Sequence, residues 1–138
     1  MKIPKFEAQT EWVKPTEFPD LRKVDEIAID LETKDPDLLK KGSGSVIGNG
    51  EVIGIAVATK FYKGYFPIAH EGGGNMDRSR VLSWLKDILE APSTKVFHNA
   101  IYDVCWLRSM GFKINGDIAC TMIASALTDE NRFRYDLN

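Results

Sequence analysis

The sequence is poor in cysteine and histidine, and its charges nearly cancel. It holds two cysteines and two histidines among 138 residues, with a formal net charge of −2. Cys105 and Cys120 form no CxxC pair and lack the spacing of zinc ligands, so we expect two reduced, packed thiols and no disulfide framework. The small negative charge argues against binding nucleic acid through a bulk positive field, but leaves room for a local site that grips phosphates through metal ions.

Long apolar runs and phosphate-binding glycine motifs are also missing. No apolar stretch is long enough to cross a bilayer, and the start, MKIPKFEAQTEW, lacks the apolar core of a signal peptide. We therefore expect a cytoplasmic protein with no membrane partner. The glycine-rich stretches have neither the dinucleotide-binding spacing nor the GK[ST] of a phosphate loop, so they predict turns.

The first half of the chain predicts a lead-in followed by strands. Residues 1–23 hold three prolines and no clear period, which predicts an extended segment that Trp12 and Phe18 pin to a single domain over residues 24–138. Three β-rich runs follow, and the glycine- and lysine-rich stretch after the first predicts a mobile surface loop. The predicted strands cover residues 24–31, 51–59 and 64–70, and the predicted loop covers residues 34–50.

The second half predicts alternating helix and strand. Residues 77–91 place their apolar side chains on one helical face, with Asp77 or Asn75 as the cap. A fourth strand is expected over TKVFHN, then a helix from Asn99 that ends at Gly111, and a third helix over CTMIASALT. This order predicts an α/β fold, a mixed sheet of a three-strand meander plus parallel strands, flanked by helices.

The run IAIDLET carries two carboxylates into the end of a buried strand. Residues two apart share a face of a strand, so Asp30 and Glu32 project side by side while Leu31 points into the core. Such a pair is electrostatically costly unless a cation neutralises it, and Mg²⁺ or Mn²⁺ prefer oxygen ligands. Taken alone, the pattern also suits a solvated strand end.

A third carboxylate comes from VFHNAIYDVCWL. Asp103 falls in the first turn of the predicted helix, where backbone N–H groups favour an anion. That position also suits a capped helix with no further role. In a mixed sheet of this order, the fourth strand can lie beside the first, which would bring Asp103 towards Asp30 and Glu32. Three converging carboxylates indicate a two-metal site.

The remaining histidines and tryptophans carry weaker signals. His70 and His98 stand far apart with no ligand spacing around them. We interpret His70 as structural and His98 as strand-end structure or a contact on the substrate side. Trp84 and Trp106 lie on apolar helical faces, so we expect both in the core.

IAIDLET and HNAIYDVCWL resemble the first two exonuclease motifs of the DEDD superfamily, with the spacing of the proofreading domain of family A, polymerase I-like, DNA polymerases. YFPIAHEGGGN and TMIASALTDENRFRYDLN resemble further segments of phage and bacterial members. The resemblance implies a ribonuclease H-like fold and 3′-to-5′ removal of nucleotides from a single-stranded DNA 3′ end, using two Mg²⁺ or Mn²⁺ ions. It implies Asp30, Glu32 and Asp103 as catalytic metal ligands, Asn99 and Tyr102 as residues that position the terminal nucleotide, and Thr33 as a backbone contact to it.

The third motif of that family, a tyrosine or histidine followed by a fourth metal-binding aspartate, is expected after YDLN, and the sequence ends at Asn138. Tyr135 and Asp136 stand where relatives have the lead-in to the next helix, so we do not expect them to replace it. The resemblance therefore implies an impaired domain, to which a polymerase domain or a separate chain would supply the motif. Two alternatives are a catalytically silent remnant that binds nucleic acid or a partner, and a ribonuclease D-like RNA exonuclease.

Overall fold

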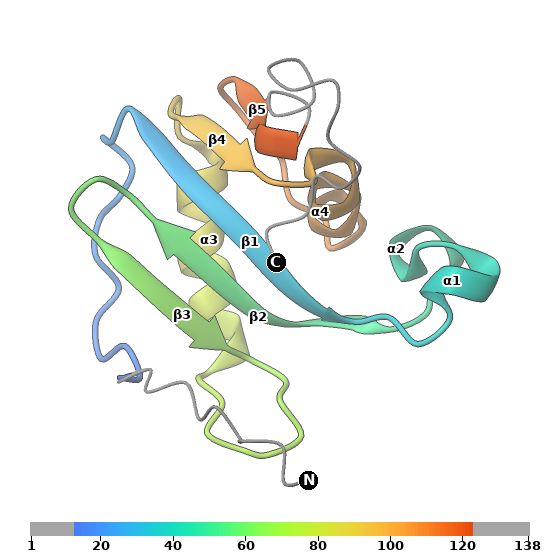
Figure 1. Ribbon diagram of the computed structural model, residues 1–138. Helices are drawn as coiled ribbons and strands as arrows, with labels where there is room; N and C mark the ends of the chain where they lie inside the picture. Colours follow the sequence, from blue (N-terminus) through green and yellow to red (C-terminus); the bar gives the residue numbers. More distant parts are fainter. Residues whose placement is uncertain (1–12, 123–138) are drawn as a thin grey trace, which may run out of the picture.

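A five-stranded mixed sheet organises the chain (Figure 1). The computed structural model describes residues 13–122. The strands are β1 (Glu26–Lys34), β2 (Glu51–Ala58), β3 (Lys63–Pro67), β4 (Thr94–Phe97) and β5 (Ile118–Cys120). They lie in the order β3-β2-β1-β4-β5. Strand β2 pairs antiparallel with both β1 and β3, β4 pairs parallel with β1, and β5 pairs parallel with β4. The predicted α/β fold, a three-strand meander plus parallel strands, is confirmed.

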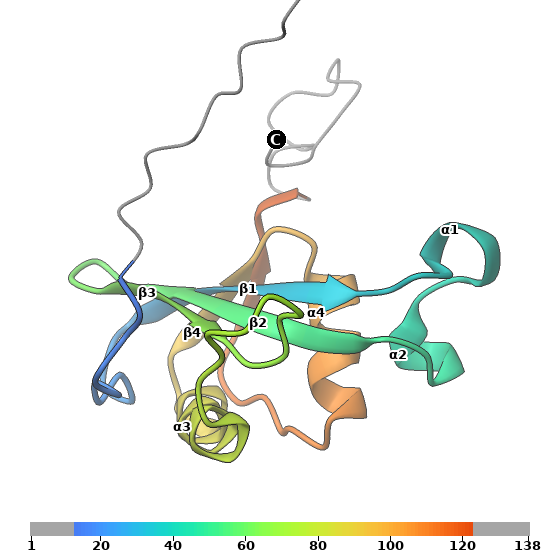
Figure 2. The same cartoon turned by 90° about the horizontal axis from the view of Figure 1, so that it is seen from below.

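Two helices cover one face of this sheet. Helix α3 (Arg78–Glu90) connects β3 to β4, and helix α4 (Ala100–Ser109) connects β4 to β5. Figure 2 shows both helices on the same side of the sheet. None of the helices within residues 13–122 is long and apolar enough to span a membrane. Within residues 13–120 the other face of the sheet carries no helix, and we call it the open face.

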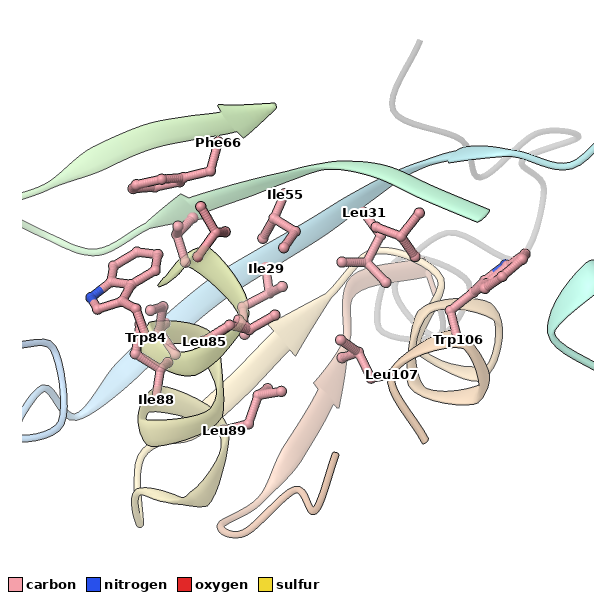
Figure 3. Packing of buried hydrophobic residues seen from close by; sticks show 14 of the residues in the cluster. Ile29, Leu31, Ile55, Phe66, Trp84, Leu85, Ile88, Leu89, Trp106 and Leu107 are labelled. Atoms are coloured by element: carbon pink, nitrogen blue, oxygen red, sulfur yellow. The ribbon is translucent and has the colours of Figure 1, made fainter. Parts of the chain in front are cut away.

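Helix α3 forms where the sequence predicted it. The Asp77 side chain accepts a hydrogen bond from the backbone N–H of Arg80 at 3.1 Å, so Asp77 and not Asn75 is the cap. The helix packs its apolar face against the sheet, as Figure 3 shows. The buried residues on that face are Val81, Trp84, Leu85, Ile88 and Leu89. The predicted core position of Trp84 is confirmed.

One aromatic side chain of the lead-in packs against this core. The ring of Phe18 stacks on that of Phe66 with centroids 5.9 Å apart, and it lies 5.7 Å from the ring of Trp84. The Trp84 indole N–H donates to the carbonyl of Pro19 at 2.7 Å. Residues 13–20 contain neither helix nor strand. The expected contact of Phe18 is present, while Trp12 lies outside the described residues.

The stretch between β1 and β2 contains two helical turns, α1 (Leu38–Lys41) and α2 (Gly44–Ile47), so the prediction of a plain loop is wrong. The Asp35 carboxylate accepts hydrogen bonds from the Gly44 N–H at 3.1 and 3.0 Å. The Asp37 carboxylate accepts one from the Asn49 amide at 2.6 Å. These side-chain acceptors stabilise the two helical turns. Because such turns do not depend on a hydrophobic period, the sequence pattern does not predict them.

The sequence predicts a third helix from Cys120, but Cys120 is the last residue of a strand, and the helical residues begin with Thr121 and Met122. Ile118–Cys120 form β5, parallel to β4, and the Lys95 N–H donates to the Asp117 carbonyl at 2.8 Å. A three-residue strand is too short for hydrophobic periodicity to distinguish it from a helix. The rest of the predicted helix lies outside the described residues, as do Tyr135 and Asp136.

Both cysteines are free thiols, in different surroundings. Cys105 is exposed on α4, so the expectation of a packed thiol is wrong there. Cys120 is half-buried, and its Sγ lies 3.2 Å from the carbonyl of His98 and 3.5 Å from the N–H of Ala100. Cys120 therefore ties the end of β5 to the junction between β4 and α4.

Lys95 is a buried lysine that no sequence pattern signalled. Its side chain is 0% exposed, and its Nζ donates to the carbonyls of Ala91, Ser93 and Asn115. Burial lowers the pKa of the Lys95 ammonium. Three backbone acceptors offset the loss of hydration, and they tie the start of β4 to the segment before β5.

Candidate active site

Asp30 and Glu32 lie on the open face of β1. The strand alternates as predicted, because Ile29 and Leu31 are buried while both carboxylates are exposed. Partial loss of hydration raises the pKa of Asp30, and the neighbouring charge of Glu32 raises it further. The predicted side-by-side placement of these two carboxylates is confirmed.

Asp103 reaches the same end of β1 from α4. The pairing of β1 with β4 stops at Ala28, so the edge of β1 beyond Ala28 has no strand partner on that side among residues 13–122. There the Asp103 carboxylate accepts a hydrogen bond from the backbone N–H of Leu31. Asp103 is 4% exposed, and burial followed by the charge of Asp30 raises its pKa to about 7. These two causes outweigh the Leu31 N–H and the helix N-terminus, which favour the anion.

Glu32 is engaged by β3 and the segment after it. Its Oε2 accepts a hydrogen bond from the Tyr65 hydroxyl and lies 3.7 Å from His70 Nε2. His70 Nε2 is also hydrogen-bonded to the Tyr65 hydroxyl. Neither Tyr65 nor His70 is among the predicted site residues, and the predicted role of His70 is structural. The available signal was the YFPIAH segment, which carries both of them.

The three carboxylates are close in pairs and do not surround one point. The charge of Glu32 raises the pKa of Asp30, and the charge of Asp30 raises the pKa of Asp103. Across residues 13–122, no three histidine, cysteine, aspartate or glutamate side chains gather closely enough to hold a metal ion.

The predicted substrate residues are only partly brought together. The Tyr102 hydroxyl donates to Asp35 Oδ2 at 2.9 Å, so the Thr33 hydroxyl, 2.8 Å away, donates to Tyr102. A β-bulge between β1 and β2 falls between Glu32 and Thr33. Asn99 is exposed at the N-cap of α4, and its side chain makes no capping hydrogen bond.

His98 lies beside Asp30 at the end of β4. Its proximity lowers the pKa of Asp30, and its Nδ1 is 2.9 Å from the Thr121 hydroxyl. Its Nε2 is buried without a hydrogen-bond partner among the described residues. Asp30 and His98 both line a hollow of about 830 Å³ on the open face of the sheet. A smaller hollow of about 330 Å³ is lined by Asp30, Glu32, Ala56 and Tyr65.

A mixed sheet with helices on one face, and a central strand that presents carboxylates on the other, defines a ribonuclease H-like α/β protein. The chain belongs to the 3′-5′ exonuclease family of family A DNA polymerases, because that family model matches residues 16–138. This match includes the segments that hold Asp30, Glu32 and Asp103.

Phage DNA polymerases are among the proteins whose sequences are similar to this chain. The DNA-directed DNA polymerase of Pseudomonas phage M6 is 41% identical over an alignment of 114 residues that covers 75% of this chain and 16% of the relative. DNA polymerase DpoZ of Acinetobacter phage SH-Ab 15497 is 27% identical over 123 residues, which are 88% of this chain and 17% of the relative. The chain thus spans about a sixth of the length of these relatives.

Solved structures share the fold. The chain superimposes on Brucella melitensis NrnC with bound Mg²⁺ with a TM-score of 0.57, covering 86% of this chain and 52% of that one, at 24% identity. NrnC bound to pGG gives the same TM-score of 0.57 at 23% identity. At this level of identity, the likeness identifies the ribonuclease H-like fold.

Proposed function

We propose that this chain is the 3′-to-5′ exonuclease portion of a DNA polymerase, with residues 24–138 as the exonuclease domain and residues 1–23 as its lead-in. Its substrate would be a single-stranded DNA 3′ end, shortened by phosphodiester hydrolysis. The observation that carries this proposal is Asp103, which is buried against the unpaired edge of β1 and close enough to Asp30 to be affected by its charge. A fold has no structural need to hold two carboxylates so close together, but a phosphate-processing cation site does.

The carboxylates fit Mg²⁺ or Mn²⁺ by their chemistry. Asp30 and Asp103 both have raised pKa values, and the charge of a neighbouring carboxylate contributes in each case. A hard divalent cation would relieve that repulsion, and such ions prefer oxygen ligands. Asp30, Glu32 and Asp103 are the residues that would hold two such ions. When bound, the ions would neutralise charge on the phosphodiester and lower the pKa of water.

The neighbouring residues would position the end of the strand. The Tyr102 hydroxyl is held between Thr33 and Asp35, which orients the half-buried ring next to the end of β1. A base can stack on such a ring whatever its identity, which suits an enzyme that removes any terminal nucleotide. The exposed Asn99 amide stands at the start of the same helix and would contact the nucleotide, while Thr33 would contact it through its backbone.

The proposed partner is a polymerase domain or a separate chain. Its role would be to supply the third motif of the family, a tyrosine or histidine and a fourth carboxylate. Support comes from the relatives, which are DNA polymerases about six times as long as the matched segment. We therefore expect the isolated 138-residue chain to degrade DNA slowly or not at all.

A 5′-labelled single-stranded oligonucleotide tests this function. The chain is assayed alone and fused to the segment that follows the matched region in the Pseudomonas phage M6 polymerase, with Mn²⁺, Mg²⁺ or EDTA. We expect the fusion to produce a ladder shortened from the 3′ end, dependent on metal and lost in Asp30→Asn and Asp103→Asn. Metal-independent products, or undiminished activity in those variants, would contradict the proposal.

A second function is favoured by one observation. Among the described residues no three potential ligands gather tightly enough for a metal ion, which suits a catalytically silent domain that binds nucleic acid or a partner. That reading predicts retention of labelled DNA without shortening, even in the fusion. An RNA oligonucleotide of the same sequence, run in parallel, tests a ribonuclease D-like preference.

A further inference from the structure

We propose that Tyr65 and His70 are positioning residues that hold the Glu32 carboxylate for cation binding. The inference rests on the proposed function and deepens it. Three observations carry it: the hydrogen bond from the Tyr65 hydroxyl to Glu32 Oε2, the contact of His70 Nε2 with that hydroxyl, and the 3.7 Å separation of His70 Nε2 from Glu32 Oε2. Together they form a chain from His70 through Tyr65 to Glu32.

A glycine lets Tyr65 reach Glu32 across the sheet. Gly54 on β2 pairs with Glu32 on one side and with Pro67 on the other. The Tyr65 side chain lies over this glycine, because a Cβ at residue 54 would stand 1.9 Å from the Tyr65 hydroxyl oxygen. A side chain at residue 54 would therefore displace Tyr65 from Glu32.

The direction of the hydrogen bonds follows from the number of protons. The Tyr65 hydroxyl has one proton, which it donates to Glu32 Oε2. His70 Nε2 must then donate to the Tyr65 oxygen, which assigns the His70 proton to Nε2. Each bond strengthens the next by polarisation. The chain engages Oε2, so the Glu32 carboxylate can turn its other oxygen to the hollow that it shares with Asp30.

The backbone around His70 is built to present this side chain. The extra residue of the β-bulge, Ile53, accepts through its carbonyl from the N–H groups of Ile68 and Ala69 at 2.9 and 3.1 Å. The Asn75 side chain then clamps the His70 backbone, accepting from its N–H at 2.7 Å and donating to its carbonyl at 2.9 Å.

The intervening EGGGN turn contains two residues with positive φ, Gly73 at 81° and Gly74 at 72°. Glycine adopts this conformation without strain, so the turn closes tightly enough for Asn75 to reach His70. The bulge, the turn and the Asn75 clamp therefore all serve to fix one imidazole beside Glu32.

Holding Glu32 in place affects cation binding more than folding. A carboxylate on the exposed face of a strand rotates freely unless a partner orients it, and ordering it on binding costs affinity. Loss of an orienting partner at a metal site typically reduces affinity roughly 10- to 100-fold. The Tyr65 hydroxyl is the group expected to have this effect.

Mn²⁺ binding to the 138-residue chain, followed by electron paramagnetic resonance of the free ion, tests the inference directly. Tyr65→Phe removes the hydroxyl and keeps the ring, and we expect it to weaken Mn²⁺ binding at least roughly 10-fold. Tyr62→Phe is the matched control, because Tyr62 packs against the same core and makes no described hydrogen bond to Glu32. We expect the control to bind Mn²⁺ as the unmodified chain does.

A double-mutant cycle separates positioning from a general structural role. If His70 acts through Tyr65, His70→Asn weakens Mn²⁺ binding in the unmodified chain and has little further effect in Tyr65→Phe. Thermal unfolding without metal should differ little among these variants, and His70→Asn keeps the test available if Tyr65→Phe folds poorly. Equal Mn²⁺ binding by the unmodified chain and both single variants would overturn the inference and leave the exonuclease proposal standing. Failure of the unmodified chain to bind Mn²⁺ would overturn both.

Discussion

At the residue scale, the folded structure disfavours ionisation of the Asp103 side chain. It is almost fully buried, faces the charge of Asp30, and has one backbone N–H, from Leu31, to favour its anion. Its pKa is raised to about 7 from an ordinary value of 3.8. A charged Asp103 therefore costs stability at neutral pH in the metal-free protein.

The stability of the metal-free chain should depend on pH through this residue. Because the folded state binds the Asp103 proton more tightly than the unfolded chain, the stabilisation is fully present below pH 4 and is lost as pH rises through 7. Asp103→Asn should remove that loss, so the variant should be the more stable at pH 8, by up to about 4 kcal/mol for a shift of this size. The difference should vanish near pH 4.

Urea unfolding in EDTA from pH 4 to pH 8 measures this effect. The control is Asp87→Asn, which changes an exposed aspartate on α3 and should leave the pH dependence as it is. A difference between Asp103→Asn and the unmodified chain that stays constant with pH would show that Asp103 does not titrate as described.

At the element scale, α3 contributes apolar packing to the core, whereas β1 also carries the carboxylates of the site. Helix α3 buries an apolar face on the sheet, and its Trp84 contacts the Phe66 ring with centroids 4.5 Å apart. Strand β1 buries Ile29 and Leu31 on that same side and presents Asp30 on the other. A substitution of Trp84 and one of Asp30 should therefore have opposite consequences for the free energy of unfolding.

Trp84→Ala should destabilise the chain by roughly 3 to 5 kcal/mol, because it leaves a cavity beside Phe66 and removes the hydrogen bond to Pro19. Asp30→Asn should be neutral or slightly stabilising without metal, because it removes a charge that Glu32 and Asp103 oppose. Denaturant titration at pH 8 in EDTA compares them. Equal losses in the two variants would mean that Asp30 has a structural role.

At the scale of the whole molecule, a cation should link the site to global stability. A ligand that binds the folded chain alone raises its stability by about 2.7 kcal/mol at 100 times its dissociation constant. Asp30 on β1 and Asp103 on α4 belong to different elements, so an ion held by both would oppose their separation.

Mn²⁺ should therefore raise the melting temperature of the unmodified chain at pH 8. Asp103→Asn should have a higher melting temperature in EDTA, because it removes the repulsion between Asp103 and Asp30. Its melting temperature should rise less with Mn²⁺, because an amide is a weaker ligand than a carboxylate. Differential scanning fluorimetry over a Mn²⁺ series measures both effects, with Asp87→Asn as the control. A gain in Asp103→Asn as large as in the unmodified chain would place the ion elsewhere.

Local pattern was enough to predict several features of this chain. The alternation in IAIDLET put Asp30 and Glu32 on one face, and the apolar period after Asp77 predicted α3, whose cap is the first of the two proposed, Asp77 or Asn75. The order of these elements predicted the mixed sheet, because a helix before the fourth strand provides the crossover that parallel pairing with the first strand requires. Such features depend on residues close in sequence, so the sequence contains their full signal.

Tertiary structure decided what depends on residues far apart in the chain. The approach of Asp103 to Asp30 requires β4 to end before β1 does, and the chain from His70 to Glu32 requires a glycine on β2 and a bulge beside it. The burial of Lys95 depends on carbonyls up to 20 residues away. Each of these arrangements is set by where separate elements end and meet, and short-range periodicity carries no information about that.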